Sequence, residues 1–360
     1  MDPYERMVKT AFVFAVFLCL LECVVTLENI TYKNQRSSIF SPFFQRIHML
    51  SFIALLSFSG CDNEEPGPSK STDTAITAEP SAEPSVKSSL DLDPEPLDLV
   101  AGVQEYTLTQ VIDGELVERL VFVHTPPLFD ADANYPVLFA FHGNGSNEPE
   151  PVAEFNIPQY GSLVDSGAFI GVYPQGHLNS WNLGQEQSTA DDSAFVHHIV
   201  EQLKISAGVN AARIFATGFS NGAGLTQNLG VHSDLFHAIA PIATALVVGQ
   251  EPNADTPIRS VLQVHGTADD VCPYEGGSDN PTGHDFYSSE QSISLWAEHN
   301  GCDETPSSTT TPDGNTLISY SSCSNGVEVA LLSVIDATHG IPPDTEGNLN
   351  QYVWSFLNTQ

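Results

Sequence analysis

The chain has 360 residues, and its 45 acidic against 11 basic side chains give a formal net charge of −34. This charge argues against nucleic acid as a partner and against attraction to an anionic membrane surface, because few cations are available to neutralise phosphates. A neutral substrate fits better. The length is sufficient to bury a sizeable core, either in one large α/β domain or in two domains of average size.

The first 61 residues have the features of an export signal, and they have them twice. One apolar run covers residues 11–21, and a second covers 49–56 and leads into Ser59-Gly60-Cys61. A basic flank, an apolar run and small residues before a cleavage point are typical of a signal peptide. The second ending resembles a bacterial lipobox, which predicts lipidation of Cys61. Because one protein needs only one signal, the doubling predicts that the translation start lies within the first 48 residues. The alternative for the first run is a membrane anchor, which its short length disfavours.

We therefore expect an exported protein, either a bacterial lipoprotein in the periplasm or at the cell surface, or a secreted one. It would meet a membrane only through its N-terminal lipid. Residues 62–100 are acidic, rich in proline and serine, and free of aromatic residues. Such a segment cannot bury a core and stays solvated. The expected organisation is an export segment at 1–61, a disordered linker at 62–100 and a folded domain at 101–360.

Apolar runs and turn signals place the elements of the folded domain. Expected strands are 106–111, 116–123, 135–141, 167–173, 212–217, 239–246, 260–264 and 327–334; expected helices follow the cap residues Asp191 and Asp192, begin at Leu225, and cover 293–299 and 352–357. Strands that alternate with helices predict a mostly parallel sheet with helices on both faces. The fold class is therefore α/β.

The turn Gly218-Phe219-Ser220-Asn221-Gly222 lies between an expected buried strand and an expected helix. Strand, G-x-S-x-G and helix together make a nucleophile elbow, a sharp turn that presents the serine hydroxyl above the sheet. Glycine suits the two flanking positions, because a side chain there would collide with neighbouring backbone. The alternative is a glycine-rich turn with an incidental serine.

A serine hydroxyl needs a base to take its proton, and the base needs an acid to orient it. On α/β-hydrolase sheets the chain order is serine, acid, histidine. Asp269 follows the strand 260–264, and His339 follows the last strand, so both fall at the edge of the sheet that carries Ser220. We predict Ser220 as nucleophile, Asp269 as acid and His339 as base, with Asp270 as the alternative acid.

Acyl transfer also needs hydrogen-bond donors for the developing oxyanion. The expected donors are the backbone N–H groups of Asn221 and of Asn144, the latter in the glycine-rich loop that begins at His142. His142 and His265 also follow strands, but neither comes after the acid in the required order, so we interpret both as structural. No metal or organic cofactor is expected: His197 and Glu201 have helical i, i+4 spacing but lack a third ligand.

Four motifs recur together in one known group of proteins. They are Phe141-His142-Gly143, Tyr173-Pro174-Gln175-Gly176 with Trp181, the Ser220 elbow, and His265 to Asp269 followed by Pro273-Tyr274. Over roughly residues 105–358 the chain resembles the polyhydroxybutyrate depolymerase and feruloyl esterase group of secreted α/β-hydrolases. The resemblance implies the α/β-hydrolase fold and the same three catalytic residues. It also suggests that Trp181 lines the substrate cleft, with an aromatic residue of the core or rim as the alternative. The sequence departs from the group around His339, where the usual preceding glycine and following aromatic residue are missing.

Three cysteines fall in the folded domain. Cys302 and Cys323 flank a polar segment, and export predicts that they form a disulfide; two free thiols are the alternative. Cys272 is expected to be a buried free thiol.

The sequence as a whole predicts a serine carboxylic-ester hydrolase that acts on a neutral ester, either of a polyester or of plant cell-wall feruloyl or acetyl groups. Two other classes remain open. One is a catalytically inactive surface binding protein on a hydrolase scaffold, since a fold does not fix a function. The other is a serine peptidase with the same three residues.

Overall fold

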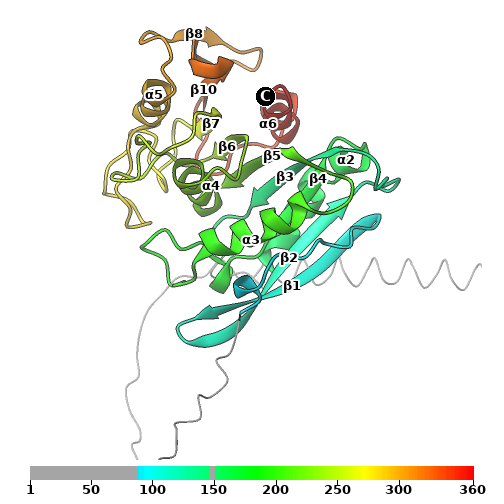
Figure 1. Cartoon of the computed structure of the whole chain (residues 1–360). Helices are drawn as coiled ribbons and strands as arrows, with labels where there is room; N and C mark the ends of the chain where they lie inside the picture. The colour runs from blue at the N-terminus through cyan, green and yellow to red at the C-terminus, as the bar shows by residue number, and fades with distance from the viewer. Residues whose placement is uncertain (1–87, 146–150) are drawn as a thin grey trace, which may run out of the picture. The chain divides into compact units, whose positions relative to one another are not determined.

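A computed structural model of the chain describes residues 88–145 and 151–360. These residues build a ten-stranded sheet in the order β1-β2-β4-β3-β5-β6-β7-β10-β9-β8 (Figure 1). The strands are β1 Gly102–Ile112, β2 Glu115–Thr125, β3 Tyr135–Phe141, β4 Ile170–Pro174, β5 Val209–Phe219, β6 Ala238–Ile242, β7 Ser260–Gly266, β8 Ser307–Thr310, β9 Thr316–Tyr320 and β10 Val329–Val334. The pairs from β4 to β10 are parallel, and the pairs at both edges are antiparallel. The predicted α/β-hydrolase fold is confirmed.

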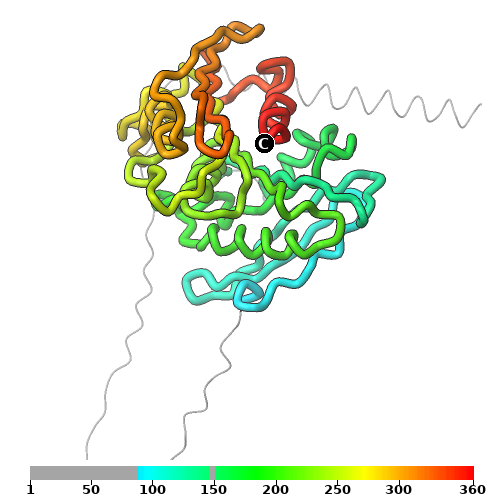
Figure 2. Tube along the Cα trace, turned by 45° about the horizontal axis from the view of Figure 1, so that its top comes forward, coloured from blue at the N-terminus to red at the C-terminus, as the bar shows by residue number. Residues whose placement is uncertain are grey.

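Helices cover both faces of this sheet (Figures 1 and 2). They are α2 Asn156–Asp165, α3 Asp192–Lys204, α4 Asn221–His232, α5 Ser289–His299 and α6 Leu349–Asn358. Residues of α3, α4 and α5 belong to one hydrophobic core, and residues of α2 and α6 belong to the other. Successive residues of β3 alternate between the two cores, Leu138 on one side and Phe139 on the other, and both are fully buried. That alternation is why the central strands are apolar without interruption.

The boundary predicted for the linker is wrong at its C-terminal end. Ser88 Oγ donates to the carbonyl of Thr109 at 2.5 Å, and the N–H of Leu97 donates to Ser206 Oγ at 2.8 Å. Leu99 is buried with the core of the domain. Apolar side chains between the acidic residues give this part of the segment surface to bury, so Ser88 to Val100 pack on the domain. The remainder of the predicted linker and the whole export segment lie outside the described residues.

Two features of the domain have no counterpart in the sequence prediction: helix α2 and the exposed hairpin of β8 and β9. The strand expected at 239–246 is also shorter than predicted, because the chain turns after Ile242, with Ala243 at a φ of 61°. Among the described residues, no helix is both long and apolar enough to cross a bilayer.

Candidate active site

Ser220 occupies a strained turn between β5 and α4. Its backbone angles are φ 55° and ψ −121°, a combination that non-glycine residues seldom adopt. The N–H of Ser220 donates to the carbonyl of Ile242 at 2.9 Å, which ties the turn to the end of the neighbouring strand β6. Strain of this kind persists only where the surrounding structure enforces it, and it concentrates at functional sites.

The glycines on both sides of Ser220 are required by close backbone contacts. A Cβ atom on Gly218 would lie 2.3 Å from the carbonyl oxygen of Gly222. A Cβ atom on Gly222 would lie 2.3 Å from the carbonyl oxygen of His142 and 2.4 Å from that of Phe141. The contacts of Gly222 with Phe141 and His142 also place the loop after β3 directly beside the elbow.

The structure brings the three predicted catalytic side chains together. Ser220 Oγ lies 2.8 Å from His339 Nε2, and His339 Nδ1 lies 2.9 Å from Asp269 Oδ2. Ser220 follows β5, Asp269 follows β7 and His339 follows β10, so three parallel strands deliver the side chains to one edge of the sheet. Because Asp269 Oδ2 can only accept a hydrogen bond, Nδ1 carries a proton and leaves Nε2 facing the serine hydroxyl.

The carboxylate of Asp269 is buried and receives four hydrogen bonds. Oδ1 accepts from the N–H groups of Val271 at 2.9 Å and Cys272 at 3.0 Å, while Oδ2 accepts from His339 and, at 3.2 Å, from His265 Nε2. Burial by itself would raise the pKa of this carboxyl. The hydrogen bonds from the two histidines and the backbone outweigh burial and lower the pKa far below its ordinary value. Asp270, the alternative acid, is exposed.

The loop after β3 is held by His142, as the sequence predicts for a structural histidine. His142 Nε2 accepts from the N–H of Gly176 at 2.9 Å, so Nδ1 carries the proton and donates to the carbonyl of Gly143 at 2.7 Å. Burial lowers the pKa of His142 to about 4, which keeps the ring neutral. Gly143 packs directly on the nucleophile: a Cβ atom there would lie 3.4 Å from Ser220 Cβ.

The two residues expected to donate to the oxyanion are the next residues in the sequence after this contact: Asn144 follows Gly143, and Asn221 follows Ser220. Asn144 is exposed beside the elbow. Asn221 is the first residue of α4, where backbone N–H groups have no partner within the helix. Both residues line the cavity that contains Ser220 and His339.

That cavity has a volume of about 490 Å³ and mixed walls. Its polar walls include Ser180, Gln185, Glu186, Gln187, Thr282 and His284, and its apolar walls include Leu178, Leu183, Val271 and Phe286. A second cavity of about 380 Å³ lies beyond Asn144, which it shares with the first. Phe155, Tyr160, Phe219, Ile341 and Leu349 make its walls largely apolar.

The prediction that Trp181 lines the substrate cleft is wrong. Its side chain is 0 % exposed and lines neither of these cavities. Its Nε1–H donates to the carbonyl of His142 at 2.8 Å, and its ring packs edge-on against Phe141 at a centroid distance of 5.4 Å. Trp181 therefore supports the loop after β3 from the interior of the domain, on the side away from solvent.

Sequence reasoning missed a buried pair of hydrogen-bonded side chains in the cavity wall. His284 Nε2 lies 2.9 Å from Glu186 Oε1, and both side chains are less than a tenth exposed. The same carboxylate oxygen accepts from Asn221 Nδ2 at 3.1 Å, which links the pair to the residue after the nucleophile. Burial acts to raise the pKa of Glu186, but the hydrogen bonds from His284 and from the Leu183 N–H lower it overall. The partners are 98 residues apart and belong to no motif, so no sequence signal marks them.

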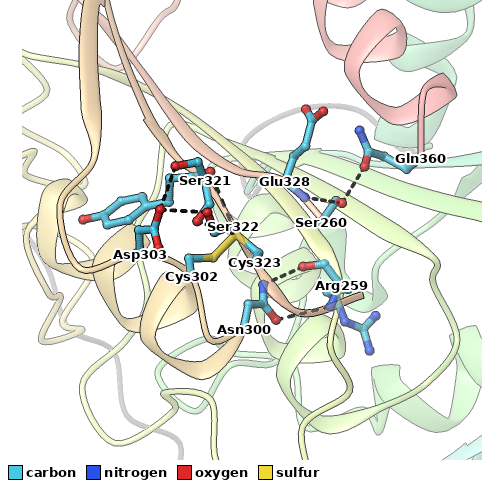
Figure 3. The surroundings of a disulfide bond; sticks show 11 residues. Arg259, Ser260, Asn300, Cys302, Asp303, Ser321, Ser322, Cys323, Glu328 and Gln360 are labelled. Atoms are coloured by element: carbon cyan, nitrogen blue, oxygen red, sulfur yellow. Dashed lines mark hydrogen bonds between the residues drawn. A yellow bond between two sulfur atoms is a disulfide. The ribbon is translucent and has the colours of Figure 1, made fainter. Parts of the chain in front are cut away.

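The predicted disulfide between Cys302 and Cys323 is present, and it joins the end of α5 to the segment after β9 (Figure 3). Cys272 is free and buried, as predicted, and burial raises the pKa of its thiol to about 12. No cluster of three or more His, Cys, Asp or Glu side chains with an arrangement suited to a metal ion occurs in residues 88–145 and 151–360.

The chain has detectable relatives among characterised proteins, although no protein-family model matches it. It is 29 % identical to feruloyl esterase B of Piromyces equi over 253 residues, which are 66 % of this chain and 45 % of the relative. It is 31 % identical to feruloyl esterase C of Emericella nidulans over 174 residues, 48 % of this chain and 62 % of the relative. A third relative, 30 % identical over 39 % of this chain and 20 % of its own length, is a bifunctional acetylxylan esterase/xylanase of Neocallimastix patriciarum.

The chain spans about half the length of the first curated relatives it matches. Among solved structures, an esterase from Thermogutta terrifontis aligns with a TM-score of 0.46 at 17 % identity, over 72 % of this chain and 90 % of that one. The chain is thus similar in sequence to proteins named feruloyl esterase, and its sheet has the strand order of the α/β-hydrolase fold.

Proposed function

We propose that this protein is a serine carboxylic-ester hydrolase. One observation carries the proposal: Ser220, His339 and Asp269 form a continuous hydrogen-bonded chain whose nucleophilic end lies on a strained elbow and opens into a cavity of about 490 Å³. A chain of this kind in the order nucleophile, base, acid is the arrangement that activates a serine hydroxyl.

In the proposed reaction, Ser220 Oγ attacks the ester carbonyl carbon while His339 Nε2 takes the hydroxyl proton. Asp269 holds the other ring nitrogen and stabilises the imidazolium that forms. The N–H groups of Asn221 and Asn144 donate to the oxyanion. Collapse of the tetrahedral intermediate releases the alcohol, which takes the proton from His339. A water molecule then attacks the acyl-enzyme with His339 again as base, and the acid product leaves. The proposal assigns no step to a metal or an organic cofactor.

The proposed substrate is a neutral ester, either a polyester or a feruloyl or acetyl ester of plant cell walls. Two named relatives are feruloyl esterases, and a third carries an acetylxylan esterase activity in its name. The formal charge of −34 favours an uncharged substrate over an anionic one. The mixed walls of the cavity suit a molecule with an apolar acyl group and a hydroxyl-rich alcohol.

We further propose that the protein is exported and that Cys61 is lipidated. The disulfide between Cys302 and Cys323 supports an oxidising compartment, because such bonds are rare in a reducing cytosol. Mass spectrometry of the mature protein tests the lipidation. A lipid-modified N-terminal Cys61 is expected, and a mature N-terminus upstream of Cys61 would contradict it.

The catalytic proposal is tested by measuring hydrolysis of p-nitrophenyl acetate, methyl ferulate, acetylated xylan, polyhydroxybutyrate and a casein peptide. The parent protein should hydrolyse at least one ester and leave the peptide intact. Ser220→Ala should abolish that turnover with an unchanged melting temperature, whereas Ser307→Ala on the exposed strand β8 should match the parent. Peptide cleavage alone would instead support a peptidase, and no turnover in the parent would support a binding protein.

A further inference from the structure

Asp269 is held by two histidines rather than one. Its Oδ2 atom accepts from His339 Nδ1 at 2.9 Å and from His265 Nε2 at 3.2 Å. The side chains of His265 and Asp269 are both 0 % exposed, whereas that of His339 is 20 % exposed toward the cavity. His265 therefore contacts the acid from the buried interior, whereas His339 contacts it from the cavity.

The neighbours of His265 fix which of its ring nitrogens carries the proton. Nε2 faces Asp269 Oδ2 and, at 2.9 Å, the carbonyl oxygen of Cys272. Both of these oxygens can only accept, so Nε2 must donate. Nδ1 lies 2.5 Å from Ser289 Oγ, whose hydroxyl can donate to it. A neutral ring in this single tautomer satisfies every contact.

Helix α5 anchors this arrangement through the hydroxyl groups of two buried serines, which contact side chains of β7. Ser289 contacts His265, and Ser292 Oγ donates to Gln263 Oε1 at 2.8 Å, two residues earlier on the same face of the strand. Both serines are 0 % exposed. The imidazole of His265 is thus fixed by the packing of α5 on the sheet.

We propose that His265 is a positioning residue of the catalytic centre. Its hydrogen bond holds Asp269 Oδ2 toward His339, and it stabilises part of the negative charge on the carboxylate, so that Asp269 attracts the proton on His339 less strongly. This inference rests on the proposed esterase function for its kinetic consequences. The lowered pKa of Asp269 agrees with it, because hydrogen bonds to the ionised form from both histidines contribute to that shift.

Apart from Asp269 and His339, the ionisable groups near His265 are either kept neutral by burial or exposed to solvent. In the loop after Asp269, burial raises the pKa of Cys272 to about 12 and also raises the pKa of Tyr274, so both stay neutral. Tyr274 is in turn hydrogen-bonded at 2.7 Å to Ser333 of β10. On α5 and in the loop, Glu290 and Asp270 are exposed to solvent.

The test compares His265→Leu, His265→Gln and Ser289→Ala with the parent. Leucine removes the donor to Asp269. Glutamine offers an amide N–H near the position of Nε2, and Ser289→Ala removes the hydroxyl that orients the ring. In His265→Leu we expect kcat to fall roughly tenfold, the scale that corresponds to losing one hydrogen bond to a charged group. We also expect the acid limb of the kcat/KM profile to move up by about half a pH unit, because Asp269 then attracts the proton on His339 more strongly.

His265→Gln should restore both values toward those of the parent, and Ser289→Ala should fall between the parent and His265→Leu. A second readout needs no turnover. In a Ser220→Ala background, the midpoint pH of the NMR titration of the His339 ring should rise least in His265→Gln, more in Ser289→Ala and most in His265→Leu. This arm stands even if the protein hydrolyses no ester, so the two proposals can fail separately.

Melting temperatures identify a variant that is only misfolded. If His265→Leu does not fold, Ser289→Ala carries the test, and an unshifted titration in it overturns the proposal. The proposal is equally overturned if a folded His265→Leu keeps the parent profile, or if His265→Gln is as impaired as His265→Leu.

Discussion

Two hydrogen-bonded networks of mostly buried side chains meet at the elbow. One reaches the solvent-accessible cavity, and the other is buried throughout. The triad network consists of Ser220, His339, Asp269, His265 and Ser289. The scaffold network consists of Arg119, Asp192, Gln175, His142 and Trp181. The triad network reaches the cavity through the 20 % exposed side chain of His339. The scaffold network closes on itself, with Arg119 and Asp192 only 1 % and 2 % exposed.

The scaffold network holds the loop after β3 from behind. Arg119 Nη2 donates to Asp192 Oδ1 at 2.7 Å and to the carbonyl of Gln175 at 3.1 Å. From there the backbone of Gly176 reaches His142. Its charges are therefore satisfied within the fold, while the triad network delivers its hydrogen bonds to a reactive hydroxyl. We expect changes in the scaffold network to cost stability and changes in the triad network to cost catalysis.

Asp269→Asn should have the largest effect. Asparagine keeps the shape of the acid but favours the wrong tautomer of His339, so we expect kcat to fall about 10⁴-fold. The melting temperature should change far less than the activity. Asp270→Asn changes the exposed neighbour and should retain parental kcat; a folded Asp269→Asn with more than a tenth of parental activity would place the acid elsewhere.

Arg119→Met should lower the free energy of unfolding and leave kcat unchanged. It leaves the carboxylate of Asp192 buried without its partner, which costs about 3–5 kcal/mol in the free energy of unfolding. The matched control is Lys204→Met. Lys204 Nζ lies 2.8 Å from Glu201 Oε1, but this pair is about a third exposed, so we expect a loss of less than about 1 kcal/mol. Equal losses in urea unfolding would refute the distinction between the buried and the exposed pair.

Acidification should destabilise the scaffold network through His142. Burial lowers the pKa of His142 to about 4 in the folded protein, against about 6.5 in an unfolded chain. Below pH 6.5 the unfolded chain takes up a proton that the folded one does not. The stabilisation is therefore complete above pH 6.5 and is lost as the pH falls to about 4.

Between pH 6.5 and 5 this single group should lower the free energy of unfolding by about 2 kcal/mol, or about 1.4 kcal/mol per pH unit. His142→Gln should lose stability at pH 7 but show a flatter dependence over that range. Asp269 contributes in a separate window: because its folded pKa is lowered, its stabilisation is lost only below about pH 4. A parental slope in His142→Gln would contradict the assignment to His142.

Trp181→Phe should have the smallest effect and tests the corrected role of this residue. It removes the Nε1–H that donates to the carbonyl of His142, so we expect a loss of about 1–2 kcal/mol in stability. KM for a hydrolysed ester should stay within about twofold of the parent, since a buried ring touches no substrate. A raised KM with unchanged stability would return Trp181 to the cleft.

The sequence predicted the triad network better than the scaffold network, for a physical reason. Ser220, Asp269 and His339 each follow a strand of a parallel sheet, and such strands end at the same edge, so chain order alone brings them together. The motif around Trp181 marks a loop near the site, but it does not tell which side of the loop faces solvent. The same limit applies to His265, whose contact with Asp269 depends on where α5 packs.

Other differences trace to weak local patterns. Helix α2 contains Pro158 and Gly161, which obscure its helical pattern, although proline is tolerated in the first turn of a helix. Strand β8 consists only of serine and threonine and is fully exposed, and β9 has Leu317 and Ile318 as neighbours, so no apolar alternation marks the hairpin. The pair Glu186 and His284 depends on two loops that meet only in three dimensions.

The central claim is that the elbow holds an activated serine, and covalent labelling tests it most directly. The parent should react with a fluorophosphonate, and peptide mapping by mass spectrometry should find the added mass on Ser220. Ser220→Ala and Asp269→Asn should label far more slowly, while Asp270→Asn should label like the parent. A folded parent that does not react, or a label on any residue other than Ser220, would contradict the account.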